Sequence, residues 1–541
     1  MASRLRPHAG YTSLMFVPAS SFVVSSHKSS SLVSKKPCAV SIHSQRRARI
    51  IPQMDASPSS ETTTETNSKH AVLGEDSAKS KSEPKFTPSP VLTTPIEMPE
   101  FKVRDGPLFK FFRSLRLFFR LRGRVKKGSI LYMELSGALP DEVGRQGPFS
   151  TGDTAPTLPQ VTNAFRNAAH DPRISAIYVK IKPLACGYAK LIEIRRHMDY
   201  FKKSGKTIYC YFEIGGEKEY YLSMGCDKVY VPPEAFFSLK GFRVNGSFLR
   251  GVLDKIGVEP QVERIGEYKS AGDQFARTSM SEAQREVLTS ILQSIYNHFV
   301  NNVVKSKEHL NEAAFREFLD RAPQSMQEYK NAGLITDIQY EDQIIDALKL
   351  QYSKGGDDEK KLKRPLRVVN LRKYARTTAR LLGLSKGSPK NMVAIIRANG
   401  AIGSGKSGKS PISGSSIGSD TIVQLLRQAS QDERIKAVVL RIDSPGGSAL
   451  ASDIMWREIR KLREKGKIVV ASMVDVAASG GYYMAMACDK IVAEEMTLTG
   501  SIGVVTAKLS LAELYRRIGF VRQNLSLGRF AELDVDNRSF T

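Results

Sequence analysis

Long apolar runs and cysteines are both scarce in this chain of 541 residues. No stretch of 18 or more consecutive apolar residues occurs, so the sequence predicts no transmembrane helix. The five cysteines are odd in number and lack metal-ligand spacing, which fits reduced thiols better than a disulfide framework and offers no metal site. A composition of 41% hydrophobic and 25% charged residues is typical of a globular protein, here long enough for two or more domains.

Acidic residues are missing where the basic residues gather. Residues 1–50 contain eight Lys/Arg and no acid, and residues 101–127 contain ten Lys/Arg with Asp105 as the single acid. These two segments supply 17 of the 26 net positive charges, so the rest of the chain is only mildly basic. A basic nucleic-acid-binding body is therefore the weaker interpretation, and we expect no nucleic-acid partner.

The N-terminal residues of the chain predict targeting rather than a folded domain. Twelve serines among the first 50 residues, with no acid, favour a chloroplast transit peptide over 1–68, the alternative being an ordinary disordered tail. Residues 69–105 resemble an unstructured linker. Over 106–127, the sequence predicts a helix with cations on one side and with Phe and Leu over most of the rest of its surface. Such a helix is expected to lie on anionic lipid; packing of its aromatic side chains on the protein body is the alternative.

An internal repeat organises the remainder. Strand and helix patterns alternate from about residue 128, which predicts α/β layers. Gly205-Lys206 matches Gly466-Lys467 at an offset of 261, and Cys226-Asp227-Lys228 matches Cys488-Asp489-Lys490 at an offset of 262. We therefore expect two copies of one α/β unit, over 128–372 and 373–541, with the second copy truncated at its C-terminal end.

Two glycine-rich turns of the second copy are candidates for chemistry. Ser479 lies after a predicted strand and opens a predicted helix, where Gly480 and Gly481 allow a substrate to approach the backbone. The turn that contains Gly446 and Gly447 has the same setting and offers a second N–H for an oxyanion hole. Alternatively, both are ordinary strand-to-helix turns of an α/β protein.

A nucleophilic serine needs a base. All eight histidines precede the second copy, so a Ser–His pair would need one of four first-copy residues to reach Ser479: His170, His197, His298 or His309. A lysine of lowered pKa is the other choice. Lys269 follows a predicted strand and a glycine turn, and the repeat aligns it with Ala531, while Ser479 aligns with Glu217. Each copy thus keeps one half of a Ser/Lys pair.

The segments GEYKSAGD, SPGGS, AASGGYY and TGSIGVV resemble, in their order, the motifs of the protease IV (signal peptide peptidase A) family in its long, duplicated form. The resemblance implies tandem Clp-protease/crotonase-like α/β superhelix domains. It implies Ser479 as nucleophile, Lys269 as general base and acid, Gly446 and Gly480 at the oxyanion, and Ser501 as a candidate to orient the lysine. It also implies ATP-independent cleavage of hydrophobic peptides, a homo-oligomeric ring with a tetramer expected, no cofactor, and a peripheral place on the stromal side of the thylakoid membrane.

Three alternatives stay open at this point. Residues 403–410 satisfy the P-loop pattern, but Pro411 and further glycines follow, so a flexible basic loop is the better interpretation and no nucleotide is expected. A crotonase-like acyl-CoA enzyme would need carboxylates near the oxyanion hole, for which Asp443 and Asp475 are the candidates. A catalytically inactive thylakoid scaffold is the third, supported by the expected truncation alone.

Overall fold

The computed structural model describes residues 98–101, 106, 107, 111, 115, 125–142, 156–307, 309–353, 355–377, 379, 381, 382, 384, 390–410 and 414–540. The transit peptide predicted over 1–68 lies outside these ranges, as do most of the predicted linker and most of the helix predicted over 106–127. In the described ranges, no helix is both long and apolar enough to cross a bilayer.

The first copy is built on a six-stranded parallel sheet in the order β8-β5-β3-β2-β1-β9. Parallel strands require crossover connections, which helices supply here. The strands are β1 (Ser129–Gly137), β2 (Ile174–Leu184), β3 (Thr207–Tyr211), β5 (Lys228–Val231), β8 (Asp337–Ile338) and β9 (Val368–Asn370). The main crossover helices are α2 (Leu158–His170), α3 (Tyr188–Lys202) and α4 (Glu217–Ser223).

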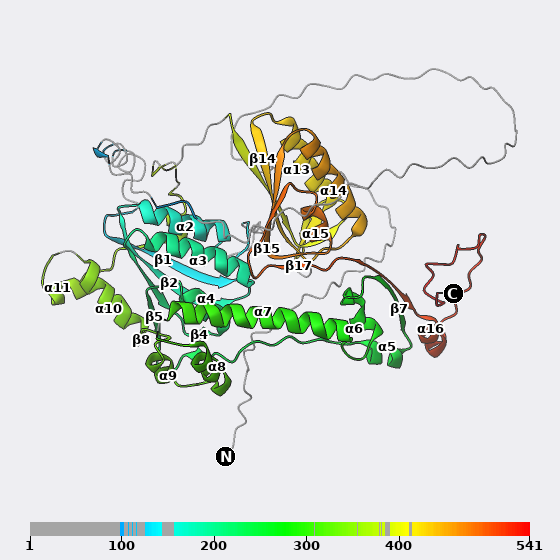
Figure 1. Cartoon of the computed structure of the whole chain (residues 1–541), viewed down its shortest axis with the longest axis horizontal. Coiled ribbons are helices and arrows are strands. Elements are labelled where there is room, and N and C mark those ends of the chain that lie inside the picture. The colour runs from blue at the N-terminus through cyan, green and yellow to red at the C-terminus, as the bar shows by residue number, and fades with distance from the viewer. Residues whose placement is uncertain are drawn as a thin grey trace, which may run out of the picture. The chain divides into compact units, whose positions relative to one another are not determined.

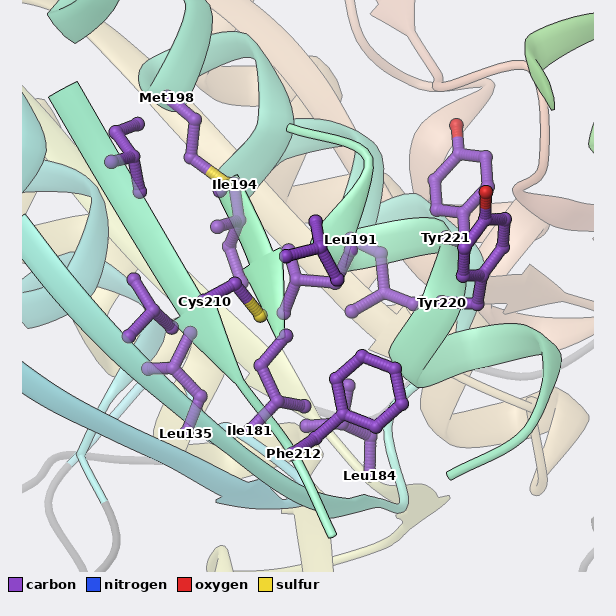
Figure 2. Close-up of a cluster of buried hydrophobic side chains, with 14 of the residues drawn as sticks. Leu135, Ile181, Leu184, Leu191, Ile194, Met198, Cys210, Phe212, Tyr220 and Tyr221 are labelled. Atoms are coloured by element: carbon purple, nitrogen blue, oxygen red, sulfur yellow. The ribbon is translucent and has the colours of Figure 1, made fainter. Parts of the chain in front are cut away.

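The core of the first copy lies between this sheet and α3 and α4. Figure 2 shows Leu191, Ile194 and Met198 of α3 facing strand residues such as Ile181 and Cys210. The three α3 side chains recur at helical spacing and are fully buried. On the other face of the sheet, α10 (Glu341–Tyr352) packs Ile344 and Leu348 on the strand tyrosines.

The rest of the first copy is mainly helical. It contains β4 (Ile214–Gly215), β6 (Phe236–Phe237), α5 (Arg250–Ile256), β7 (Glu259–Ile265), η1 (Ser270–Gly272), α6 (Asp273–Ala276), α7 (Glu282–Ser306), α8 (Glu312–Arg321), α9 (Met326–Asn331), α11 (Asp358–Lys363) and α12 (Leu371–Tyr374). The last helix, α12, straddles the boundary predicted at residue 372, and Tyr374 belongs to the first core.

The second copy repeats the layered plan. Its parallel sheet has the order β10-β14-β15-β16, with β17 pairing the far end of β15. These strands are β10 (Met392–Asn399), β14 (Ile435–Ser444), β15 (Ile468–Ala478), β16 (Lys490–Val492) and β17 (Leu498–Gly500). Figure 1 shows α13 (Ser419–Gln431), α14 (Ala449–Glu464) and α15 (Gly480–Ala485) gathered beside this sheet, and they share its buried core.

Corresponding elements of the two copies begin at the offsets found in the sequence. The helix α14 follows α3 by 261 residues, β15 follows β3 by 261, and β16 follows β5 by 262. The helix α16 (Ala512–Ile518) follows α5 by 262, and both end in a glycine at φ of 73–78°, Gly257 and Gly519. The prediction of tandem α/β units is confirmed.

One strand pairing joins the copies directly. Strand β18 (Val504–Ser510) of the second copy runs antiparallel to β7 of the first, from Val504 opposite Ile265 to Ser510 opposite Glu259. This pairing carries the segment after β7 towards the end of β15, where the candidate serine lies.

The P-loop pattern adopts a structure that differs from the predicted loop. A three-stranded ribbon orders β11 (Ala401–Gly403), β13 (Gly414–Gly418) and β12 (Gly408–Ser410), with β12 antiparallel to β13. The flexible-loop prediction is therefore wrong for Gly408–Ser410. The residues of β12 pair antiparallel with β13 there, and the next helix begins only at Ser419.

Candidate active site

Ser479 occupies a strained turn between β15 and α15. Its backbone has φ 53° and ψ −117°, and only four non-glycine residues in the described part of the chain have positive φ. Such a conformation costs about 1–3 kcal/mol and persists only where neighbouring structure enforces it. The Ser479 N–H donates to the Gly500 carbonyl at 2.9 Å, and the Ser479 carbonyl accepts from Tyr483 N–H at 2.8 Å. The turn thus presents a half-buried hydroxyl at the N-terminus of a helix.

Lys269 enters the same region from the first copy. It follows β7, and only 6% of its surface is exposed. Its ammonium donates to Ser501 Oγ at 2.9 Å and also to the Ser501 carbonyl. Burial lowers the pKa of Lys269 below the ordinary lysine value. A buried lysine without a carboxylate partner in its hydrogen bonds is suited to work as a neutral amine.

Ser501 connects the lysine to the serine turn. It follows β17, whose Gly500 pairs with Ala478 and accepts the Ser479 N–H. Ser501 itself has a strained φ of 51°. The structure therefore brings Ser501 and Lys269 into direct contact, and it links both to Ser479 through one residue. Within the described residues, no hydrogen bond joins Ser479 Oγ to Lys269 Nζ.

Gly446 packs directly against the serine turn. A Cβ added to Gly446, whose φ is 97°, would lie 2.7 Å from Ser479 Cβ and 2.7 Å from Gly480 N. The Gly446 N–H donates to Ser444 Oγ at 3.1 Å. For the N–H groups of Gly447 and Gly480, the described residues supply no acceptor. Two backbone donors beside Ser479 thus have no acceptor in the described chain. The Gly446 N–H already donates to Ser444, a buried residue that sequence reasoning missed.

The carboxylates considered for acyl-CoA chemistry form ion pairs instead. Asp443 and Asp475 both contact the ammonium of Lys190, at 2.9 and 3.4 Å. Because these oxygens also accept backbone N–H groups, they hold the fold together at the edge of the site. No cluster of His, Cys, Asp and Glu side chains suited to a metal ion occurs in the described ranges.

The histidines left open by the sequence have partners away from Ser479. His170 hydrogen-bonds to Tyr200, His197 to the Glu193 carbonyl, His298 to Tyr221 and Glu495, and His309 to the Ala332 carbonyl. The position in the first copy that matches Ser479 is also filled differently. There the Glu217 carboxylate accepts the N–H groups of Lys240 at 2.7 Å and Gly241 at 3.0 Å.

Comparison with known proteins finds one family pattern and several relatives that are similar to this chain. The sequence pattern of Peptidase family S49 matches residues 200–353 and again 461–541, and the second match starts 261 residues after the first, as the internal repeat does. The chain is 47% identical to "Serine protease SPPA, chloroplastic" of Arabidopsis thaliana over 76% of its length and 58% of that protein. It is 28% identical to "Protease 4" of Haemophilus influenzae (69% and 60%) and of Salmonella typhi (76% and 66%). The chain spans less than two thirds of each of these relatives.

Proposed function

We propose that the chain is a member of peptidase family S49, with a Clp-protease/crotonase-like α/β fold in two copies, and that it is an ATP-independent serine endopeptidase with a Ser479/Lys269 dyad. The observation that carries the proposal is the buried Lys269 of the first copy, hydrogen-bonded to Ser501 beside the strained Ser479 turn of the second.

The proposed reaction uses the residues in distinct roles. Neutral Lys269 takes the proton of Ser479 Oγ, which attacks the peptide carbonyl carbon. The resulting oxyanion accepts N–H groups from the Gly480 and Gly446 turns. Lys269 then donates its proton to the leaving amine, and water hydrolyses the acyl-enzyme with Lys269 again as base. Ser501 keeps the amine oriented throughout.

The substrates proposed are hydrophobic peptides and membrane-associated polypeptides, such as signal-peptide remnants and damaged thylakoid proteins. One Arabidopsis relative is described as chloroplastic, which supports a chloroplast location together with the composition of residues 1–68. A peripheral position on the stromal side of the thylakoid membrane, reached through the basic segment 106–127, remains part of this proposal.

We also propose that copies of the chain assemble head to tail into a ring, with a tetramer expected. By the repeat offset of 262, β18 and β7 correspond to residues 242–248 and 521–527. Within the described chain neither of these segments lies in a strand, and Val521, Leu525 and Leu527 are 79–103% exposed. The β18–β7 register predicts that Asn245 of one chain lies opposite Asn524 of the next.

The assembly can be tested by cross-linking. Under oxidation, the variant carrying Asn245→Cys and Asn524→Cys should form covalent multimers on a non-reducing gel. The matched control carries Val262→Cys and Ala507→Cys, which face each other within one chain, and it should stay monomeric on the gel. Multimers from the control alone, or from neither, contradict the proposed register.

The catalytic proposal is tested with a fluorophosphonate serine probe and with casein hydrolysis. Labelling and hydrolysis by the wild type should both be lost in Ser479→Ala and kept in Ser204→Ala, a first-copy hydroxyl bonded to the Phe201 carbonyl. Labelling that persists in Ser479→Ala contradicts the assigned nucleophile. A wild type that neither reacts with the probe nor cleaves casein contradicts the enzyme and favours the scaffold alternative.

A further inference from the structure

A buried lysine of the first copy lies behind the two turns that form the site. Lys190 of α3 is 7% exposed, and its ammonium contacts Asp443 Oδ2 at 2.9 Å and Asp475 Oδ2 at 3.4 Å. The two carboxylates come from different strands of the second copy, β14 and β15. One cation therefore bridges two strands that belong to the other repeat.

Each carboxylate directly precedes one of the functional turns. Asp443 lies three residues before Gly446, and Asp475 lies four residues before Ser479. A displacement of either aspartate therefore reaches its turn through three or four residues. The ammonium of Lys190 contacts the residues from which the Gly446 turn and the Ser479 turn both start.

The strand ladder does not fix that distance by itself. Strands β14 and β15 pair regularly up to Ile442 opposite Met473, and they resume at Ser444 opposite Ala477. One residue of β14 thus faces three of β15, which is a bulge next to the site. At this interruption Asp443 Oδ1 accepts the Val476 N–H at 3.2 Å, so a side chain replaces the missing ladder bonds.

Asp475 also caps a helix of the other copy. The N-cap residue of α3 is Gly187, which has no side chain, and Asp475 accepts the N–H groups of Gly187 at 2.7 Å and Lys190 at 3.1 Å. In the second copy the matching N-cap is Ser448, which caps α14 with its own hydroxyl. A Cβ on Gly187 would lie 2.5 Å from the Asp475 carboxyl carbon, so glycine makes room for this cap.

The reverse bridge, from the second copy to the first, lacks the corresponding lysine and the corresponding Asp443 carboxylate. By the 261 offset, Lys190 corresponds to Ala451 and Asp443 corresponds to Lys182. Burial raises the pKa of Asp475 and the Lys190 charge opposes that rise, so loss of Lys190 would favour the protonated carboxyl and weaken its cap on α3. Asp141 and Glu193, held by Arg441, are the other charged groups nearby.

We propose that Lys190 is a positioning residue for the peptidase site: by bridging Asp443 and Asp475 it sets the separation of the Gly446 and Ser479 turns. The proposal rests on the proposed function for its effect on catalysis, while its effect on the two turns does not. Under this proposal the first copy contributes both the base, Lys269, and Lys190, the residue that positions the two turns around it.

The test replaces Lys190 by Met and by Arg in the full-length chain. Lys190→Met should lower kcat by about 10- to 100-fold, with KM changed less than twofold, because misplacement of about 1 Å costs about this much. The part of the pH profile in which kcat/KM rises with pH reports Lys269, and its midpoint should not change. Hydrogen exchange should accelerate in residues 443–447 and 475–481, and Lys190→Arg should restore both readouts in part.

Lys206→Met is the matched control. Lys206 also donates its ammonium to protein groups, the carbonyls of Ala168 and Asp171 at 2.7 and 2.8 Å, but away from these turns. It should lower thermal stability without changing exchange in the two turns or kcat. If Lys190→Met does not fold, Asp443→Asn gives the same readouts with the lysine retained.

The outcomes separate the two proposals. Unchanged exchange and kcat in folded Lys190→Met and Asp443→Asn overturn the positioning role. A fall in kcat matched by a general loss of protection throughout the chain also overturns it, because that pattern reports global destabilisation. Faster exchange confined to the two turns, in a protein whose wild type never reacts with the fluorophosphonate probe, supports the positioning role and contradicts the peptidase instead.

Discussion

The same turn is built in two ways in the two copies. In the second copy, Ser479 precedes α15 with a strained backbone and a hydroxyl that has no partner in the described chain. In the first copy, Glu217 is already the first residue of α4, and its carboxylate binds two backbone N–H groups of the following loop. One turn is strained and leaves a hydroxyl without a partner in the described chain, whereas its counterpart has a carboxylate whose Oε1 accepts two backbone N–H groups.

Under the proposed function, the two copies divide the catalytic residues between them. A single copy would have to strain its turn, bury a lysine and still fold. Here the first copy contributes a deep core, with α10 closing the second face of its sheet, and lends Lys269 and Lys190 to its neighbour. The second copy carries the strained turn against that support.

Replacement of the proposed base, Lys269, is the strongest way to test this division. Lys269→Met should reduce kcat/KM by about 10²- to 10⁴-fold, the usual contribution of a general base. In the wild type, kcat/KM should rise with pH through a pKa below the ordinary lysine value of about 10.4, because burial lowers the pKa of Lys269. A pH–rate profile of casein hydrolysis checks this, and replacement of an exposed first-copy lysine, Lys240→Met, is the control.

The same substitution should stabilise the fold. A lysine whose folded pKa is lowered binds fewer protons in the native than in the unfolded chain between its folded pKa and the ordinary lysine pKa, so wild-type stability should rise with pH over that window. Lys269→Met should flatten that slope and raise the urea midpoint at pH 7. A variant that loses both activity and stability would show that Lys269 is structural.

A buried ion pair of the first copy and the more exposed equivalent pair of the second copy offer the next contrast. Arg173 binds Asp171 in bidentate fashion at 2.9 and 2.7 Å, and Arg434 binds Asp432 with the same two distances. The Asp171 carboxylate is fully buried and also accepts from Tyr374, whereas the Asp432 side chain is 22% exposed. Only the first copy covers its pair.

Asp171→Asn should therefore lower the free energy of unfolding by about 3–5 kcal/mol, since it leaves a buried guanidinium without its partner. Asp432→Asn should leave the urea midpoint at neutral pH almost unchanged. The hydrogen bond from Arg434 lowers the pKa of Asp432 to about 2, so the small contribution of this pair should vanish only as the pH falls through that value. Equal losses in the two variants would contradict the burial argument.

The pairing of Ser479 with Lys269 stays a prediction, drawn from the repeat and from the family resemblance; what the structure shows is Lys269 hydrogen-bonded to Ser501. The sequence predicted the α/β layers, because apolar strands alternate with amphipathic helices. It could not predict the Lys190 bridge, since Asp443 and Asp475 look like ordinary residues near strand ends until the bulge in β15 brings them together. The ribbon of β12 was missed because Gly408, Lys409 and Ser410 have low strand propensity, although β12 pairs antiparallel with β13, the next strand in sequence.

Gly446→Ala should produce a smaller loss of activity, about 10²-fold in kcat. The added Cβ would lie 2.7 Å from Ser479 Cβ and would displace the turn that carries the proposed nucleophile. In the first copy the matching residue is Ala185, which is tolerated where no nucleophile turn approaches. Gly466→Ala is the control, because it adds a Cβ at positive φ with open space around it. Equal loss of kcat in both variants would assign the effect to backbone strain alone.

Glu217 should respond most weakly, and only in stability. Glu217→Ser removes the acceptor of two backbone N–H groups and should cost about 1–3 kcal/mol, while kcat at Ser479 stays unchanged. Burial raises the pKa of Glu217, so the native chain holds its proton longer than the unfolded chain, and wild-type stability should fall as the pH rises through that pKa. Glu217→Gln keeps the acceptor oxygen and should remove this slope.

Adding Ala531→Lys to Glu217→Ser should still give no fluorophosphonate labelling of the first copy, because residue 217 lies within a regular helix and lacks the strained turn that exposes Ser479. Labelling of Ser479→Ala that carries those two changes would show that a serine and a lysine at these positions suffice, and that the strained turn is not required.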